Sequence, residues 1–214
     1  MRVKICGFTS EADVKNAAKF GADMIGVIMV SGSKRYLDAA MAKHVLSAAP
    51  RGVSRVIVVM PGSIEDLKTL EDKLRPDYIQ IHLTFPPADL VRARSQLKAS
   101  LIVVAPVPPN VVDRKSVIAN AVRIAEVGDI LLIDTKGPTG GGTGLAHDWT
   151  ISREIRQSVD KPVFLAGGLN PSNVVAALHA VRPEGVDVSS GVEAASGAKD
   201  PELMREFIRA ARSS

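Results

Sequence analysis

Short apolar runs alternate with longer amphipathic stretches along the whole chain. The apolar runs, rich in Val, Ile and Leu, predict strands at 3–6, 24–29, 55–59, 78–81, 101–105, 130–134, 163–166 and 185–188. Between them, apolar residues recur every three or four positions, which is the spacing of one helix face. These stretches predict helices at 10–20, 38–48, 63–74, 87–97, 111–127, 150–158, 171–181 and 201–211.

Residues at the helix ends support this division. Ser10, three residues before an aspartate, is typical of an N-cap, and Gly21 stands where the first helix should end. An Asn-Pro pair at 170–171 and an Asp-Pro pair at 200–201 each predict a cap followed by a first-turn proline.

Eight consecutive strand–helix units predict a particular sheet. A helix after each strand returns the chain to the same end, so all strands run parallel. Eight such units close into a barrel, and 214 residues suffice for a small one. We therefore predict an α/β fold with a single (β/α)8 TIM-barrel catalytic domain spanning residues 1–214. The alternative is an open doubly wound sheet, usually marked by a glycine-rich turn after the first strand, whereas residues 6–9 read Cys-Gly-Phe-Thr.

Charge and hydropathy exclude some classes of protein. The chain has 27 Lys and Arg against 23 Asp and Glu, a net charge of +4 that suits an anionic small molecule and equally a basic surface without a role. No dense Lys/Arg run is interleaved with aromatic residues, so nucleic-acid binding is not indicated. No apolar run approaches the roughly 18 residues of a membrane span, so we expect no membrane partner.

Cysteine content and the N-terminal residues bear on the compartment. Cys6 is the sole cysteine, so no internal disulfide forms, which favours a reducing compartment. The first residues predict a strand rather than a signal peptide. We therefore expect a cytoplasmic protein, and nothing in the sequence favours a monomer over a homodimer. We expect neither a metal nor a cofactor, because metal-ligand spacings and nucleotide fingerprints are missing from the sequence.

Two reactive side chains stand at predicted carboxyl ends of strands, where barrel enzymes have their active sites. Cys6 ends the first strand and Asp134 ends the sixth. Each also has a structural interpretation, Cys6 as a small buried apolar residue and Asp134 as a loop cap. Together they would place a thiol that can ionise to a base near a carboxyl whose pKa burial would raise. That pair suits proton transfer on a small molecule.

Further polar residues follow other strands. Lys34 and Arg35 come after the second strand, His82 follows the fourth, and Asp187 lies on or at the end of the eighth. Taken alone, His82 is better explained as a polar residue without a role. We include Arg35, His82 and Asp187 among the candidate substrate-binding residues.

Glycine-rich turns follow the seventh and eighth strands. Gly167 and Gly168 lie in the first turn, and Ser189, Ser190 and Gly191 lie in the second. Barrel enzymes often bind phosphate in these two loops, because glycine lets backbone N–H groups approach the anion closely. Two such turns in consecutive loops predict a small phosphorylated substrate.

Seven motifs, in order along the chain, resemble the phosphoribosylanthranilate isomerase family. They are Lys-Ile-Cys-Gly at 4–7, Ser-Lys-Arg-Tyr at 33–36, Gln-Ile-His at 80–82, Leu-Ile-Asp-Thr at 132–135, Gly-Gly-Thr-Gly at 141–144, Ala-Gly-Gly-Leu at 166–169 and Val-Asp-Val-Ser-Ser-Gly-Val-Glu at 186–193. The first and last are the most specific, and the resemblance covers essentially the whole chain.

The resemblance implies a (β/α)8 barrel and an Amadori rearrangement in tryptophan biosynthesis. The family converts N-(5-phosphoribosyl)anthranilate into 1-(2-carboxyphenylamino)-1-deoxyribulose 5-phosphate without a metal or cofactor. By resemblance, Asp134 is the general acid that opens the ribose ring, and Cys6 is the general base that takes the proton from the second sugar carbon. Arg35 holds the anthranilate carboxylate through paired hydrogen bonds. The two glycine-rich turns bind the phosphate.

Two positions depart from the family's pattern, and three alternatives stay open. Leu83 stands where a glycine is often found, and Val104 lies where a lysine is common. A histidine-pathway isomerase performs the same chemistry with an aspartate in place of Cys6, and a pentose-phosphate epimerase requires metal ligands that the sequence lacks. A non-catalytic barrel that binds a phosphorylated metabolite is the third alternative, against which the joint presence of Cys6, Arg35 and Asp134 argues.

Overall fold

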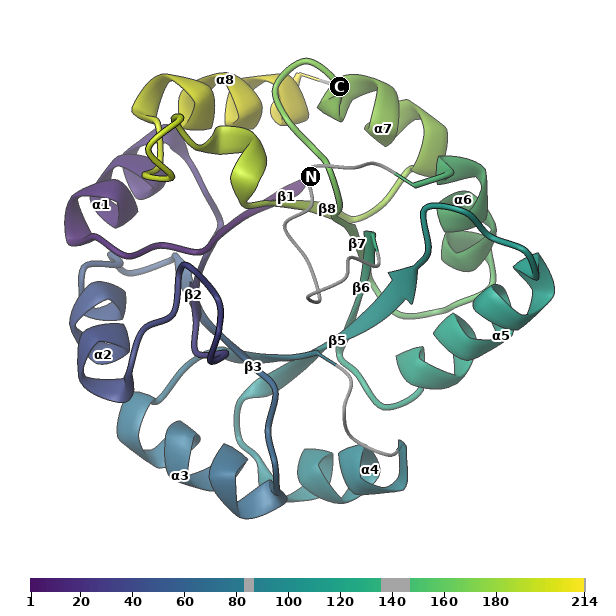
Figure 1. Cartoon of the computed structure of the whole chain (residues 1–214), viewed down its shortest axis with the longest axis horizontal. Coiled ribbons are helices and arrows are strands. Elements are labelled where there is room, and N and C mark those ends of the chain that lie inside the picture. The colour runs from purple at the N-terminus through teal and green to yellow at the C-terminus, as the bar shows by residue number, and fades with distance from the viewer. Residues whose placement is uncertain (83–86, 136–146, 214) are drawn as a thin grey trace.

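The structure is a computed structural model that describes residues 1–82, 87–135 and 147–213. Eight parallel strands form a closed barrel in sequence order, and helices surround them (Figure 1). The strands are β1 (Arg2–Cys6), β2 (Met24–Ile28), β3 (Ser54–Val59), β4 (Tyr78–Ile81), β5 (Ser100–Val107), β6 (Ile130–Thr135), β7 (Val163–Leu165) and β8 (Gly185–Val188). The helices are α1 (Glu11–Phe20), α2 (Ala39–Ser47), α3 (Ile64–Leu74), α4 (Pro87–Gln96), α5 (Arg114–Ala125), α6 (Trp149–Gln157), α7 (Val174–Val181) and α8 (Pro201–Arg212), with a 3₁₀ turn at Ser190–Val192. The predicted barrel is confirmed.

Helix ends show where local signals hold and where one fails. The Ser10 hydroxyl caps α1, Gly21 ends that helix with a φ of 102°, and Asp200 caps α8. The cap predicted at Asn170 is wrong, because α7 begins only at Val174. The Asn170 side chain instead accepts hydrogen bonds from the backbone N–H groups two and three residues later, which forms a turn before the helix.

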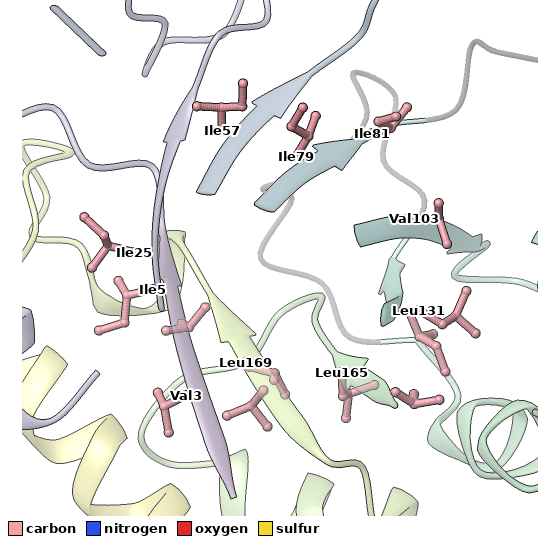
Figure 2. Close-up of a cluster of buried hydrophobic side chains, with 14 of the residues drawn as sticks. Val3, Ile5, Ile25, Ile57, Ile79, Ile81, Val103, Leu131, Leu165 and Leu169 are labelled. Atoms are coloured by element: carbon pink, nitrogen blue, oxygen red, sulfur yellow. The ribbon is translucent and has the colours of Figure 1, made fainter. Parts of the chain in front are cut away.

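Alternation along each strand produces two apolar cores. Residues on the outer face of the strands pack against the helices, and many of them are drawn in Figure 2, among them Val3, Ile5, Ile25, Ile57 and Ile79. A smaller cluster fills the barrel interior. It contains Met24, Val56, Ile102, Val104, Ile130, Leu132, Phe164 and Ala166. A packed apolar interior of this kind is typical of a TIM barrel.

Closure of the barrel depends on the first and last strands. β1 pairs with β2 on one side and with β8 on the other, and α8 packs beside α1 (Figure 1). In this register Lys4 lies opposite Asp187, and Cys6 lies opposite Gly26. Residues separated by most of the chain therefore become neighbours at the barrel wall. Among the described residues, no helix has the length and apolar character needed to cross a bilayer.

Candidate active site

One cavity at the carboxyl ends of the strands is lined by every residue that the sequence singled out as a site candidate. These residues are Cys6, Arg35, His82, Asp134, Gly167, Gly168, Asp187, Ser189, Ser190 and Gly191. They belong to β1, β6, β8 and the segments after β2, β4, β7 and β8. A closed parallel barrel brings them together because all its strands end at the same rim.

The thiol and the carboxyl predicted to transfer protons both line this cavity. Cys6 is 5% exposed at the end of β1, and Asp134 is the penultimate residue of β6. Burial raises the pKa of the Asp134 carboxyl from 3.8 to about 7, and the nearby Asp187 carboxylate adds to the effect. Burial also raises the pKa of the Cys6 thiol, whereas the charge of Lys4 opposes that rise. Near neutral pH, Asp134 can therefore donate a proton, and Cys6 depends on nearby positive charge to ionise.

Arg35 reaches the cavity from the loop before α2, which hydrogen bonds fold back onto β2. Its guanidinium already has a protein partner, because Nε and Nη2 donate to the two carboxylate oxygens of Glu193 at 2.6 and 2.7 Å. Lys199 donates to the same carboxylate at 2.8 Å and to the Ser189 carbonyl at 2.9 Å. Burial acts to raise the pKa of Glu193, but the hydrogen bonds from Arg35 and Lys199 lower it overall. As far as the described residues are concerned, the Nη1 group and one Nη2 hydrogen of Arg35 are left for a ligand.

A buried ion pair lies at the base of the cavity. The Lys4 ammonium is completely buried and lies 3.0 Å from Oδ2 of Asp187. Burial acts to lower the pKa of Lys4, but the interactions with Asp187 and Cys6 together raise that pKa overall. Lys4 therefore carries a positive charge inside the barrel. Oδ1 of Asp187 has no hydrogen-bond partner among the described residues, although it is buried.

Gln80 on β4 and His82, which directly follows this strand, place two polar side chains at the cavity. Gln80 and His82 are two residues apart, and their Nε2 atoms lie 3.5 Å from each other. Burial, and the charge of Lys4, lower the pKa of His82 from 6.5 to about 4, so this imidazole is neutral near pH 7. Within the described part of the chain, the buried Oε1 of Gln80 also lacks a partner. An unpaired buried acceptor is costly, so these open oxygens suit the hydroxyl groups of a ligand.

The two glycine turns pack closely against other backbone. Gly167 has a φ of 87°, and a Cβ there would lie 2.1 Å from Oγ1 of Thr135. A Cβ on Gly191 would lie 1.9 Å from the carbonyl oxygen of Leu169, so the two turns touch. The N–H groups of Gly167 and Gly168 donate to no acceptor among the described residues. Unpaired N–H groups beside a cavity are typical of an anion-binding site.

A buried polar chain supports the end of β6. The Thr135 hydroxyl lies 2.8 Å from Nδ1 of His147, and Nε2 of His147 contacts the Ser152 hydroxyl on α6. Burial lowers the pKa of His147 to about 4. Because Thr135 directly follows Asp134, this chain fixes the strand end that carries the carboxyl.

Sequence reasoning missed five residues around the cavity: Lys4, Gln80, His147, Glu193 and Lys199. Three of them, Lys4, Gln80 and Glu193, stand within the motifs given above, but only strand ends and the turns after them were considered for function. Residues two positions apart in a strand point to the same side of the sheet. Lys4, two positions before Cys6, could therefore have been predicted to point into the barrel interior as Cys6 does. Val104, the departure on β5, packs in the apolar interior cluster. Leu83 and the motif at 141–144 lie outside the described residues.

The fold and the cavity together define a (β/α)8-barrel enzyme with a thiol, a carboxyl and two glycine turns around one small-molecule site. Comparison with known proteins specifies it further. Residues 3–210 match the family model described as N-(5'phosphoribosyl)anthranilate (PRA) isomerase. The N-(5'-phosphoribosyl)anthranilate isomerase of Haloferax volcanii is 41% identical over 214 residues, covering 99% of this chain and 93% of that protein. The chain belongs to this family, and it catalyses the Amadori isomerisation in tryptophan biosynthesis.

Solved structures agree with this assignment. The phosphoribosyl anthranilate isomerase of Thermotoga maritima superimposes with a TM-score of 0.88 at 32% identity, and each chain is fully covered. A second structure of such an isomerase, in complex with reduced 1-(o-carboxyphenylamino)-1-deoxyribulose 5-phosphate, has a TM-score of 0.85 at 29% identity. It also covers both chains completely. The activity predicted from the sequence is confirmed.

Proposed function

We propose that Asp134 and Cys6 perform the two proton transfers of the isomerisation. The observation that supports this most directly is that both line one cavity, where burial raises the pKa of Asp134 to about 7. A carboxyl with that pKa is partly protonated under physiological conditions, as a general acid must be. The non-catalytic alternative has no explanation for such a carboxyl in the same cavity as a buried thiol.

In the first step the Asp134 carboxyl donates its proton to the ribose ring oxygen. The bond between that oxygen and the first sugar carbon breaks, and the lone pair of the anthranilate nitrogen forms a C=N bond. The product is a protonated Schiff base with an open sugar chain. A neutral carboxyl is needed, so the low polarity around Asp134 directly favours this step.

In the second step the Cys6 thiolate removes the proton from the second sugar carbon. The electron pair of the C–H bond forms a C=C bond, and the C=N electrons return to nitrogen, which gives an enolamine. Its tautomerisation yields the ketone product. The proton that Cys6 takes ends on sulfur, and Asp134 is left as a carboxylate. Before the next turnover a proton must pass from the Cys6 thiol to the Asp134 carboxylate, directly or by exchange with solvent.

Polar residues around the pair would bind the substrate. The Nη1 edge of Arg35 would hold the anthranilate carboxylate, with Glu193 fixing the other edge. The open oxygens of Asp187 and Gln80 would accept hydrogen bonds from sugar hydroxyls. Neutral His82 lies at the same rim and would provide a further hydrogen bond.

The phosphate would bind between the two glycine turns. Gly167 and Gly168 have N–H groups available, and Ser189, Ser190 and Gly191 form the facing turn. The Lys199 ammonium, hydrogen-bonded to the Ser189 carbonyl, adds positive charge to that turn. We further propose that the chain works as one catalytic domain, 1–214, on a small phosphorylated substrate in the cytoplasm.

A fluorescence assay tests the proposal. Phosphoribosylanthranilate is generated in situ, and its disappearance is followed with the wild-type protein, with Cys6→Ala and with Asp134→Asn. We expect turnover by the wild type and a loss of roughly two to four orders of magnitude in each variant, the range for removing a general acid or base. Near-normal turnover by either folded variant would remove that residue from the mechanism.

A further inference from the structure

The largest completely buried side chain of the barrel is a lysine. Lys4 has no exposed surface and lies two residues before Cys6 on β1, so both side chains point to the barrel interior. A buried ammonium is costly unless it is paired, and Asp187 on β8 pairs with it at 3.0 Å. An apolar residue would fill the same space at lower cost, so the charge needs a reason beyond packing.

A glycine brings the ammonium and the sulfur into one space. Gly26 on β2 lies opposite Cys6, and a Cβ there would lie 2.9 Å from the Cys6 Sγ and 3.4 Å from the Lys4 Nζ. Both atoms therefore converge on the same point of the barrel wall, where β2 has no side chain to separate them. The positive charge of Lys4 therefore acts on the Cys6 thiol and lowers its pKa against the effect of burial.

Three charged side chains act on Cys6. Lys4 on β1 and Lys199 before α8 favour the thiolate, and Asp187 on β8 opposes it. Lys4 has the largest effect of the three. Burial disfavours the thiolate more than any of them, so the base exists only because a cation offsets part of that cost.

We propose that Lys4 is a positioning residue that acts through Cys6, its buried ammonium stabilising the thiolate that serves as the catalytic base. This inference rests on the proposed role of Cys6. Lys4 keeps its proton throughout, because Asp187 holds it as an ammonium. When Cys6 takes the proton from the sugar carbon, its sulfur becomes neutral and the contact with Lys4 weakens. Lys4 thus sets how much thiolate is present rather than touching the substrate.

The test measures the thiol pKa directly. The rate of Cys6 alkylation by iodoacetamide is followed against pH in the wild type, in Lys4→Met and in Lys15→Met, a control that removes an exposed lysine from α1. We expect the thiol pKa of Lys4→Met to rise by about 1 unit or more, and that of Lys15→Met to stay unchanged. The kcat of Lys4→Met should fall by about tenfold or more, with KM within about threefold of wild type. An unchanged thiol pKa in folded Lys4→Met would overturn the proposal.

A second comparison tests the proposal in case Lys4→Met does not fold. Lys4→Met leaves Asp187 buried and unpaired, so Asp187→Asn and Lys4→Met/Asp187→Asn are measured as well. Removing the carboxylate alone should lower the thiol pKa, and removing Lys4 from that background should raise it again. Equal thiol pKa values in these two proteins would contradict the proposal.

The double variant Lys4→Met/Cys6→Ala separates this proposal from the role of Cys6. If Lys4 acts through Cys6, adding Lys4→Met to Cys6→Ala should lower kcat no further. A further loss of about tenfold would show that Lys4 acts on its own. If Cys6→Ala turns over normally, the role of Cys6 fails, whereas the alkylation experiment still decides whether Lys4 controls the thiol.

Discussion

Arg35 and Glu193 form a two-point ion pair across the cavity rim, with distances of 2.6 and 2.7 Å. Glu193 follows the Ser189–Gly191 turn and also accepts a hydrogen bond from Lys199. The residue proposed to bind the anthranilate carboxylate is therefore tied to the loop proposed to bind the phosphate. The groups that would bind the carboxylate and the phosphate of the substrate are therefore held at a fixed distance from each other.

The first prediction separates Arg35 from Glu193. Arg35→Met should chiefly raise KM, lowering kcat/KM by an amount equivalent to about 2–4 kcal/mol for a desolvated pair. Binding of a substrate analogue without the carboxylate, measured by inhibition, should weaken with the wild type but not with Arg35→Met. Glu193→Gln keeps the shape and should give a smaller loss, on the order of tenfold, because Arg35 is present but less firmly oriented. If the analogue loses the same factor in wild type and Arg35→Met, Arg35 does not hold the carboxylate.

The second prediction concerns covalent modification of Cys6. Alkylation should inactivate the enzyme, and bound product should slow the inactivation, because Cys6 is the sole cysteine and lines the cavity. Mass spectrometry would check that one alkyl group is added per chain. Full activity of the singly alkylated protein would contradict a role for the thiol.

The third prediction is a pH profile. In the proposed mechanism the active form has protonated Asp134 and ionised Cys6, yet the pKa of Asp134 is about 7 and that of Cys6 is raised above its ordinary value. The wild-type kcat/KM should therefore rise to about pH 7, remain level, and fall again at alkaline pH. Asp134→Asn should lose the break near pH 7, and its lower activity should continue to rise with pH until Cys6 is ionised. The substrate phosphate ionises identically for both proteins, so the difference between the profiles isolates Asp134.

The fourth prediction links the same carboxyl to stability. Between pH 3.8 and about 7, folded Asp134 holds a proton that the unfolded chain has lost, so its burial destabilises the fold increasingly as pH rises through this window. Asp134→Asn should match wild type in denaturant melts near pH 4 and exceed it above pH 7, by at most about 4 kcal/mol. Asp113→Asn, which alters an exposed helix cap with a lowered pKa, should show the opposite trend. A constant Asp134→Asn difference at all pH values would mean that this carboxyl is not buried as a neutral group.

The fifth prediction concerns the phosphate turns. Inorganic phosphate should inhibit the wild type competitively. Gly191→Ala should weaken that inhibition and raise KM about tenfold or more, because its Cβ would meet the Leu169 carbonyl at 1.9 Å and force the two turns apart. Gly62→Ala, whose Cβ would meet only a flexible carboxylate at 3.2 Å, serves as the control. Normal phosphate inhibition of folded Gly191→Ala would place the phosphate elsewhere.

Strands, helices and strand ends could be predicted because their signals are local. Period-two and period-3.6 patterns identify the elements, and eight repeats imply a parallel barrel whose strand ends share one rim. From these patterns alone, Cys6, Asp134 and the glycine turns were predicted to lie around one cavity. The helix cap predicted at Asn170 was wrong, because an asparagine before a proline can also form a turn, and here that turn precedes the helix.

The pairing of charged side chains depends on contacts between residues that are far apart in the chain. Arg35 and Glu193 are 158 positions apart, and Lys4 and Asp187 are 183 positions apart. No local pattern encodes these partners, since they depend on the register with which β8 closes onto β1 and on side chains meeting across it. Burial is likewise a property of the closed barrel, and it moves the pKa of Asp134 to about 7. Local patterns in the sequence therefore predicted the fold and the candidate reacting groups, whereas the protonation states of those groups depend on burial in the folded barrel.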